Sequence, residues 1–139
     1  MKKHTMIAAV IAAMFFNAAA YSQATLQKHN CKTEIAKANY LMGMRSDNAG
    51  LKESSMMQTA KVKMLYPDVN FQEIKNVTDS IAVNGKTPAI RYEAYLASNV
   101  LENPVWFAKC SHQTIEDPDT FFISVASQLQ ERILGSRTY

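Results

Sequence analysis

The fold class follows most directly from residues 87–102, which read TPAIRYEAYLASNVLE. Thr87 offers a side-chain oxygen that can cap a helix. Pro88 suits the first helical position, because the N–H that it lacks would have no partner there. Apolar residues then recur every three or four positions, at Ile90, Ala94, Ala97 and Leu101. This spacing places them on one side of a helix, so the stretch predicts an amphipathic helix over 88–102.

The same start signal appears twice more, as Asn103-Pro104 and Asp117-Pro118. Each pair places a capping residue immediately before a proline, as expected where a helix begins. Asn70, with Glu73 three residues later, resembles a capping box in which Asn takes the role of Ser or Thr. The chain therefore carries several independent helix starts.

Other apolar stripes repeat the helical spacing. They consist of Cys31, Ile35, Ala38 and Met42; Met57, Ala60 and Met64; Phe71, Ile74, Val77 and Ile81; and Phe122, Ala126, Leu129 and Ile133. We expect helices near 26–45, 51–65, 71–83, 88–102 and 118–134, and a short one near 104–112. The predicted fold class is all-α, a small bundle of five to six helices closed by one disulfide.

The first twenty residues have the three regions of a secretory signal peptide. Lys2 and Lys3 form a basic start, residues 6–16 are apolar, and Ala18-Ala19-Ala20 supplies small residues for a peptidase. The apolar run is shorter than the roughly 20 residues of a membrane-spanning helix. A retained N-terminal anchor is the alternative.

We therefore expect a Sec-type signal peptide over 1–20 and one helical domain over 21–139. Ser22 and Ala24 are alternative cleavage positions. The expected location is the periplasm or the exterior, without stable membrane insertion after cleavage.

The net charge gives no support for nucleic-acid binding. The whole chain has 15 Lys and Arg against 12 Asp and Glu, a balance of +3. Removal of Lys2 and Lys3 leaves 13 against 12, or +1. A charge near zero provides no attraction to a nucleic acid or to an acidic membrane surface.

The two cysteines, Cys31 and Cys110, both remain after removal of the signal. An even number of cysteines in an exported chain favours a disulfide between them. A redox-active pair is the alternative, although the spacing is not Cys-x-x-Cys. A zinc site is a further alternative, with His29, Cys31, Cys110 and His112 as ligands, although their spacings differ from the usual patterns.

Five methionines of the mature chain, at positions 42, 44, 56, 57 and 64, allow two interpretations. Thioethers bind Cu(I), and methionine also fills irregular gaps in a core. Core packing is favoured, because no Met-x-x-Met run or histidine cluster accompanies them. We expect no cofactor and no bound metal.

The sequence contains no arrangement typical of a catalytic site. The serines lack a Gly-x-Ser-x-Gly elbow, and no phosphate-binding loop is present. Glu116, Asp117 and Asp119 fit a helix N-terminus better than acid–base catalysis. The chain is therefore not expected to be an enzyme.

Three tyrosines, Tyr40, Tyr92 and Tyr95, lie off the deepest apolar stripes. Tyrosine is enriched at the centres of protein–protein interfaces. These residues are candidates for an interaction surface, although they could equally cover the edge of the core.

Short motifs across residues 31–110 resemble a group of uncharacterised small exported proteobacterial proteins that are helical and carry a cysteine pair. The likeness rests on Cys31, Ala36, Met42, Arg45, Gly50, Val77, Ala82, Thr87 and the segment Trp106-Phe107-Ala108-Lys109-Cys110. This chain differs in a longer loop around 66–70 and in an additional C-terminal helix. The resemblance implies a helical, disulfide-closed exported domain and no catalytic residue. A looser analogy, at the level of the fold alone, is to small periplasmic immunity proteins.

The function expected from these observations is a protein-interaction module that binds another periplasmic or envelope protein. Inhibitors, immunity-type proteins and envelope accessory factors belong to this class. The alternatives are an envelope-stress chaperone or holdase and a zinc- or copper-binding protein. The oligomeric state is open, and a homo-oligomer is compatible with the sequence.

Overall fold

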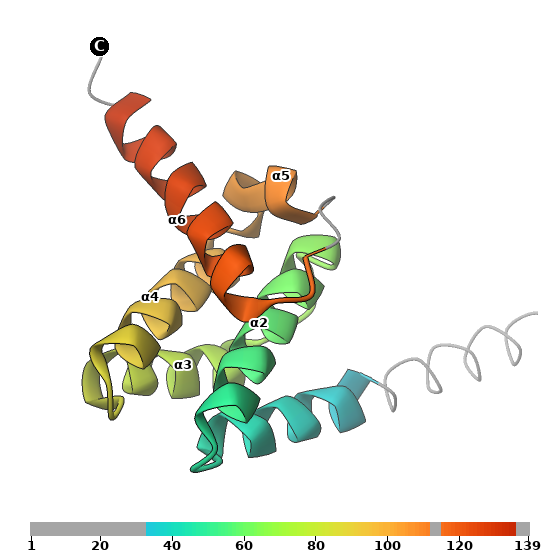
Figure 1. The fold of residues 1–139 in the computed structure, drawn as a ribbon. Coiled ribbons are helices and arrows are strands. Elements are labelled where there is room, and N and C mark those ends of the chain that lie inside the picture. The colour runs from blue at the N-terminus through green and yellow to red at the C-terminus, as the bar shows by residue number, and fades with distance from the viewer. Residues whose placement is uncertain (1–32, 112–114, 136–139) are drawn as a thin grey trace, which may run out of the picture. The chain divides into compact units, whose positions relative to one another are not determined.

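The computed structural model describes residues 33–111 and 115–135 (Figure 1). The chain divides into two units, Met1–Ala36 and Lys37–Tyr139. Residues 33–36 of the first unit are described, and they are helical. The predicted signal peptide lies outside the described residues.

Every element among the described residues is helical, which confirms the all-α prediction for this part of the chain. A helix over 33–45 is followed by α2 (Ala49–Leu65), α3 (Gln72–Asn84), α4 (Pro88–Glu102) and α6 (Pro118–Gly135). Between α4 and α6 lie a short 3-10 helix, η1 (Pro104–Phe107), and a single α-helical turn, α5 (Ala108–Ser111). The predicted boundaries of α3, α4 and α6 agree with these bounds to within one residue.

Two of the predicted caps form. Thr87 accepts a hydrogen bond from the backbone N–H of Ile90 at 3.2 Å and begins α4. Asp117 accepts one from the N–H of Thr120 at 2.9 Å, before α6. Sequence analysis missed a third cap, Asn48, whose side chain accepts from the N–H of Leu51 at 3.0 Å and starts α2.

The two other predicted start signals differ in outcome. Asn103 occupies the N-cap position of η1, which begins at Pro104 as predicted, but its side chain makes no capping hydrogen bond. The predicted capping box at Asn70 was wrong. Phe71 occupies the N-cap position of α3, while Asn70 accepts from the N–H of Gln72 in a local turn. Glu73 lies 3.6 Å from Arg45, in an exposed ion pair.

Helix α4 is the central element of the second unit, and it contacts α2, α3, α6 and η1. The predicted stripe of α4 is confirmed, because Ile90, Ala94, Ala97 and Leu101 are all buried. Leu96 and Val100 are buried as well, so that α4 is covered on more than one side. Alanines on the stripe allow neighbouring helices to approach the α4 backbone closely.

The predicted stripe of the first helix was wrong. Met42 is 69% exposed and Ala38 is exposed, whereas Leu41 and Met44 are buried in the core. The helix packs against α2 through the side that carries Gly43, where the absence of a side chain admits Ser55. The close approach to α2 at Gly43 thus accompanies burial of a different side of this helix from the side that the apolar stripe predicts.

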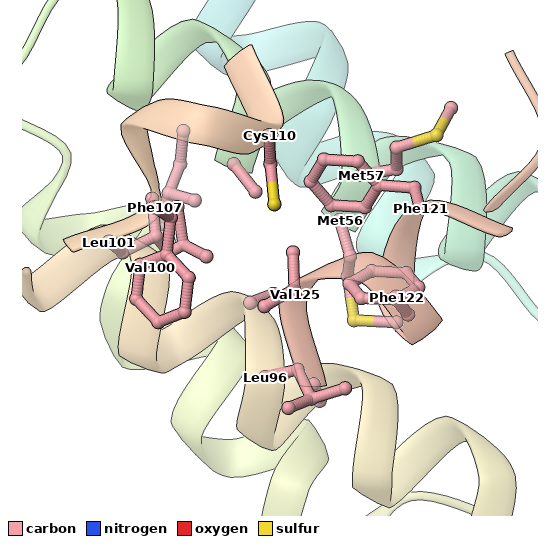
Figure 2. Close-up of a cluster of buried hydrophobic side chains, with 14 of the residues drawn as sticks. Met56, Met57, Leu96, Val100, Leu101, Phe107, Cys110, Phe121, Phe122 and Val125 are labelled. Atoms are coloured by element: carbon pink, nitrogen blue, oxygen red, sulfur yellow. The ribbon is translucent and has the colours of Figure 1, made fainter. Parts of the chain in front are cut away.

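The core combines aliphatic side chains with aromatic and sulfur-containing ones from several helices (Figure 2). Its largest fully buried members include Phe107, Phe121, Met44, Met56 and Met57. The rings of Phe121 and Phe122 meet edge to face, with centroids 5.2 Å apart, which is a favourable aromatic geometry. Met44, Met56 and Met57 fill the core and Met64 packs against it, as the sequence predicts, whereas Met42 is 69% exposed.

Candidate functional site

An apolar groove lies between α4 and α6. It has a volume of about 820 Å³, within the range of ligand-binding clefts. Its α4 wall is formed by Ala89, Tyr92, Glu93 and Tyr95; its α6 wall includes Phe122, Ile123, Ala126, Leu129, Ile133 and Leu134. Both walls carry large apolar or aromatic side chains that solvent can reach, so the groove is a candidate binding site.

Helix α6 carries more apolar residues than the core buries, and the others form the α6 wall of the groove. Phe121 and Val125 are fully buried and anchor α6 to the rest of the unit. The neighbouring stripe starts buried at Phe122 and ends exposed at Ile133. In Figure 1 the C-terminal half of α6 extends past its neighbours, and residues 130–135 are all exposed.

The α4 wall brings together two of the three candidate tyrosines. Tyr92 and Tyr95 are three positions apart, so they lie on neighbouring parts of one helix face, and both are about half exposed. Tyr40 is partly buried against the core from another helix and does not line the groove. The structure thus joins Tyr92 and Tyr95 in one surface and places Tyr40 apart from it.

Glu93 is the chemically unusual residue of the groove. Its side chain is on the groove wall, yet the residue is only 8% exposed. Its Oε2 atom is buried and has no hydrogen-bond partner in the part of the chain that the structure describes. A buried carboxyl oxygen without a partner carries a substantial desolvation cost.

The surroundings of Glu93 raise its pKa to about 7. Burial is the largest cause, because it disfavours the charged form. The negative charges of Glu53, from α2, and Asp119, at the start of α6, add to the shift. Asp119 also lines the groove, whereas no lysine or arginine among the described residues does.

Sequence analysis missed Glu93 as a site residue, although a signal was present. Glu93 follows Ile90 by three positions and precedes Ala97 by four, which places a charged residue among the buried positions of α4. Acidic residues are rarely buried without a partner. The wall of the groove formed by α6 could not be predicted from the sequence, because the sequence does not specify which helix covers this part of α4.

Cys110 lies in the core rather than in the groove. Figure 2 shows its sulfur directed into the cluster that contains Phe107 and Phe121, and its Sγ atom is 3.3 Å from Oγ of Ser124. Burial raises the pKa of the thiol. The structure describes Cys110 as a free thiol, and its predicted disulfide partner, Cys31, lies outside the described residues. The disulfide therefore stays a prediction.

The spacing of Trp106, Phe107 and Cys110 in the sequence would place all three on one face of a regular helix, and the structure agrees with this only in part. Phe107 is buried beside it, but Trp106 is 42% exposed and stacks under the guanidinium of Arg132 at 5.0 Å. The reason is that Trp106 belongs to the 3-10 helix η1 and Cys110 to the α-helical turn α5, so the two residues do not lie on one regular helix.

The alternative zinc site cannot be placed, because His29, Cys31 and His112 lie outside the described residues. Within 33–111 and 115–135, no three side chains of His, Cys, Asp or Glu are arranged to hold a metal ion. In these same ranges, no helix combines the length and the apolar character needed to cross a membrane.

Comparison with known proteins identified no matching family model, no similar curated protein and no similar solved structure. The resemblance to small exported proteobacterial proteins therefore stays a prediction. Arguments for a function come from the α4–α6 groove.

Proposed function

We propose that this protein is a protein-interaction module of the bacterial envelope, and that the α4–α6 groove binds an apolar segment of a partner protein. The observation that carries the proposal is the exposure of large apolar and aromatic side chains on both walls of one concavity. Contiguous apolar surface that is open to solvent is typical of a binding site.

The composition of the groove supports binding rather than catalysis. Among the described residues, its lining offers two carboxyl groups, two phenols, the hydroxyl of Ser127 and the amide of Gln130, but neither a histidine nor a cysteine. Tyrosines at the rim supply large contact areas at a low cost in conformational entropy. An inhibitor, an immunity-type protein or an envelope accessory factor would use such a surface.

The helical walls support a helical occupant. From Asp119 to Leu134 the α6 wall extends over sixteen residues, and its fifteen steps span about 22 Å at a rise of about 1.5 Å per residue. This length matches about four turns of a partner helix, whose apolar face can lie in such a groove. The described residues offer no sheet edge to which a partner strand could be added.

The alternative of an acid-activated holdase has less support. Such a protein exposes apolar surface as the pH falls. The titration of Glu93 acts in the opposite direction, because protonation removes a buried charge and stabilises the fold.

Site-specific photo-crosslinking in living cells tests the proposed function. A photoreactive phenylalanine analogue would replace Ile123, which is 67% exposed on the groove wall, or Val83, which is equally apolar and exposed but lies on α3. We expect one discrete adduct from position 123 and none from position 83. Ala126→Trp, which fills the groove, should abolish the adduct.

The proposal fails if position 123 gives no adduct, or if positions 123 and 83 give the same adducts. Circular dichroism and thermal unfolding of Ala126→Trp would show that the loss of the adduct reflects a filled groove in a folded protein. Mass spectrometry of the adduct would identify the bound segment.

A further inference from the structure

We propose that the partner segment is an amphipathic helix that carries one lysine or arginine among its apolar residues, and that this basic side chain pairs with Glu93 in the α4–α6 groove. The inference rests on the proposed function, because it describes the occupant of that same groove. It names the chemistry by which the partner would be recognised.

The Oε2 atom of Glu93 is buried and lacks a hydrogen-bond partner among the described residues. Polar groups that are more than nine-tenths buried almost always have one. Glu93 is 8% exposed and belongs to the wall of the groove, so an occupant of the groove is well placed to provide the missing donor.

The described charged groups that line the groove or influence the titration of Glu93 are acidic. Glu93 and Asp119 line the groove, and Glu53 of α2 is close enough to Glu93 to influence its titration. On the side of α3, Asp79 pairs with Lys75 and accepts a hydrogen bond from the hydroxyl of Ser98 on α4. Neither Lys75 nor Asp79 forms a hydrogen bond with Glu93. Electrostatic complementarity therefore favours a cation in the occupant.

The surroundings of Glu93 suit an organic cation rather than a metal ion. Glu53, Glu93 and Asp119 do not form a metal-binding cluster in the described part of the chain. The rest of the lining is mainly apolar, which suits the aliphatic stem of lysine or arginine and the apolar residues beside it. Tyr92 and Tyr95 also offer aromatic faces to a cation near the rim.

Selection from a phage-displayed library of helical peptides tests the inference and does not require an identified partner. The library would randomise charged and apolar positions, and the full-length protein would be the target at pH 8. Peptides that Ala126→Trp no longer binds would be kept as groove binders. We expect them to combine apolar residues at helical spacing with a single lysine or arginine.

Binding of the selected peptides to variants then measures the contribution of the pair. Glu93→Gln should weaken binding at least tenfold, as expected when a charge-assisted hydrogen bond is lost. Glu131→Gln removes an exposed carboxyl group of α6 outside the groove and should leave the affinity unchanged. Replacing the basic residue of the peptide by glutamine should have the same effect as Glu93→Gln, and the two changes together should cost little more than either alone.

A second measurement needs no variant. Because the pKa of Glu93 is about 7, a lysine-bearing peptide should bind the wild-type protein about tenfold more weakly at pH 6 than at pH 8. A peptide with glutamine at that position should lack this dependence. This readout holds even if Glu93→Gln disturbs the fold.

The outcomes separate this inference from the proposed function. Groove binders that lack a basic residue and ignore Glu93→Gln would overturn the inference and leave the proposed function standing. A selection that yields no groove binder would overturn both. A concentration-dependent dimer that Ala126→Trp disrupts would also overturn the inference, because a second copy would then occupy the groove.

Discussion

At the scale of single residues, Glu93 connects the stability of this protein to its proposed binding. An aliphatic residue at this position would complete the apolar wall and avoid the desolvation cost of a carboxyl group. The fold retains a residue that weakens it at neutral pH, where part of the carboxyl population is ionised. A partner that supplies a positive charge would offset the desolvation cost of the Glu93 carboxylate, and this pairing would favour segments that carry such a charge.

The first prediction concerns this local cost. The pKa of Glu93 is raised from 4.5 in the unfolded chain to about 7 in the folded protein. As the pH rises, the carboxyl group of Glu93 loses its proton near pH 4.5 in the unfolded chain but only near pH 7 in the folded protein. The protonated group therefore contributes stability at low pH, and this contribution declines as the pH rises from 4.5 through 7. Between pH 5 and pH 8, the free energy of unfolding of the wild-type protein should fall by about 2 to 3 kcal/mol relative to that of Glu93→Gln.

Urea unfolding of both proteins at pH 5 and pH 8 measures this difference. Glu131→Gln, which removes an exposed carboxyl group, should follow the pH dependence of the wild type. Parallel pH profiles of wild type and Glu93→Gln would show that Glu93 is not desolvated as described.

At the scale of the elements, contacts between helices determine which apolar residues are buried, and several of these differ from the positions predicted from the sequence. On α6, Phe121 and Val125 take the deepest places, and the predicted stripe becomes the wall of the groove. On the first helix, Gly43 permits a close approach to α2 that no apolar stripe would have indicated. A helical period identifies the residues that share a face, but the shape of the neighbouring helix determines which face is buried.

The second prediction concerns the contact at Gly43. A Cβ atom at this position would lie 2.0 Å from Oγ and 3.1 Å from Cβ of Ser55. The hydroxyl cannot turn away without losing its hydrogen bond to the carbonyl of Leu51, which is 2.7 Å long. Gly43→Ala should therefore destabilise the protein by about 1 to 3 kcal/mol, as expected for overpacking.

Thermal or urea unfolding measures this cost, and adding Ser55→Ala to Gly43→Ala should recover part of it by removing the clashing oxygen. Gly50→Ala is the matched control. A Cβ there would meet only Oδ1 of Asn48 at 3.6 Å, so this substitution should leave the stability unchanged or raise it by up to about 1 kcal/mol. Equal effects of the two alanine substitutions would contradict the close contact.

At the scale of the whole molecule, the sequence predicts a covalent link between Cys31 and Cys110. Cys110 is held in the core, and the predicted bridge would close a loop of about 80 residues. Such a loop corresponds to roughly 4 to 5 kcal/mol in the chain-entropy model. The third prediction is that protein recovered from an oxidising compartment contains no free thiol.

Alkylation in denaturant, followed by mass spectrometry of the intact protein, counts the thiols and locates the N-terminus. The denaturant is necessary because burial raises the pKa of the Cys110 thiol and shields it from reagents in the folded state. The reduced protein serves as the control with two reactive thiols. Two alkylated cysteines in protein that was never reduced would refute the bridge, and a chain that still begins at Met1 would refute the cleaved signal.

The sequence alone was sufficient to predict the helical class, the limits of α4 and α6, and the caps at Thr87 and Asp117. These features depend on interactions within a few residues, which the order of the amino acids specifies directly. The tertiary structure alone decided that Tyr92, Tyr95 and the outer face of α6 share a groove, and that Glu93 is buried within it. Burial and pKa depend on which distant helix covers a residue, and that contact is a property of the folded chain as a whole.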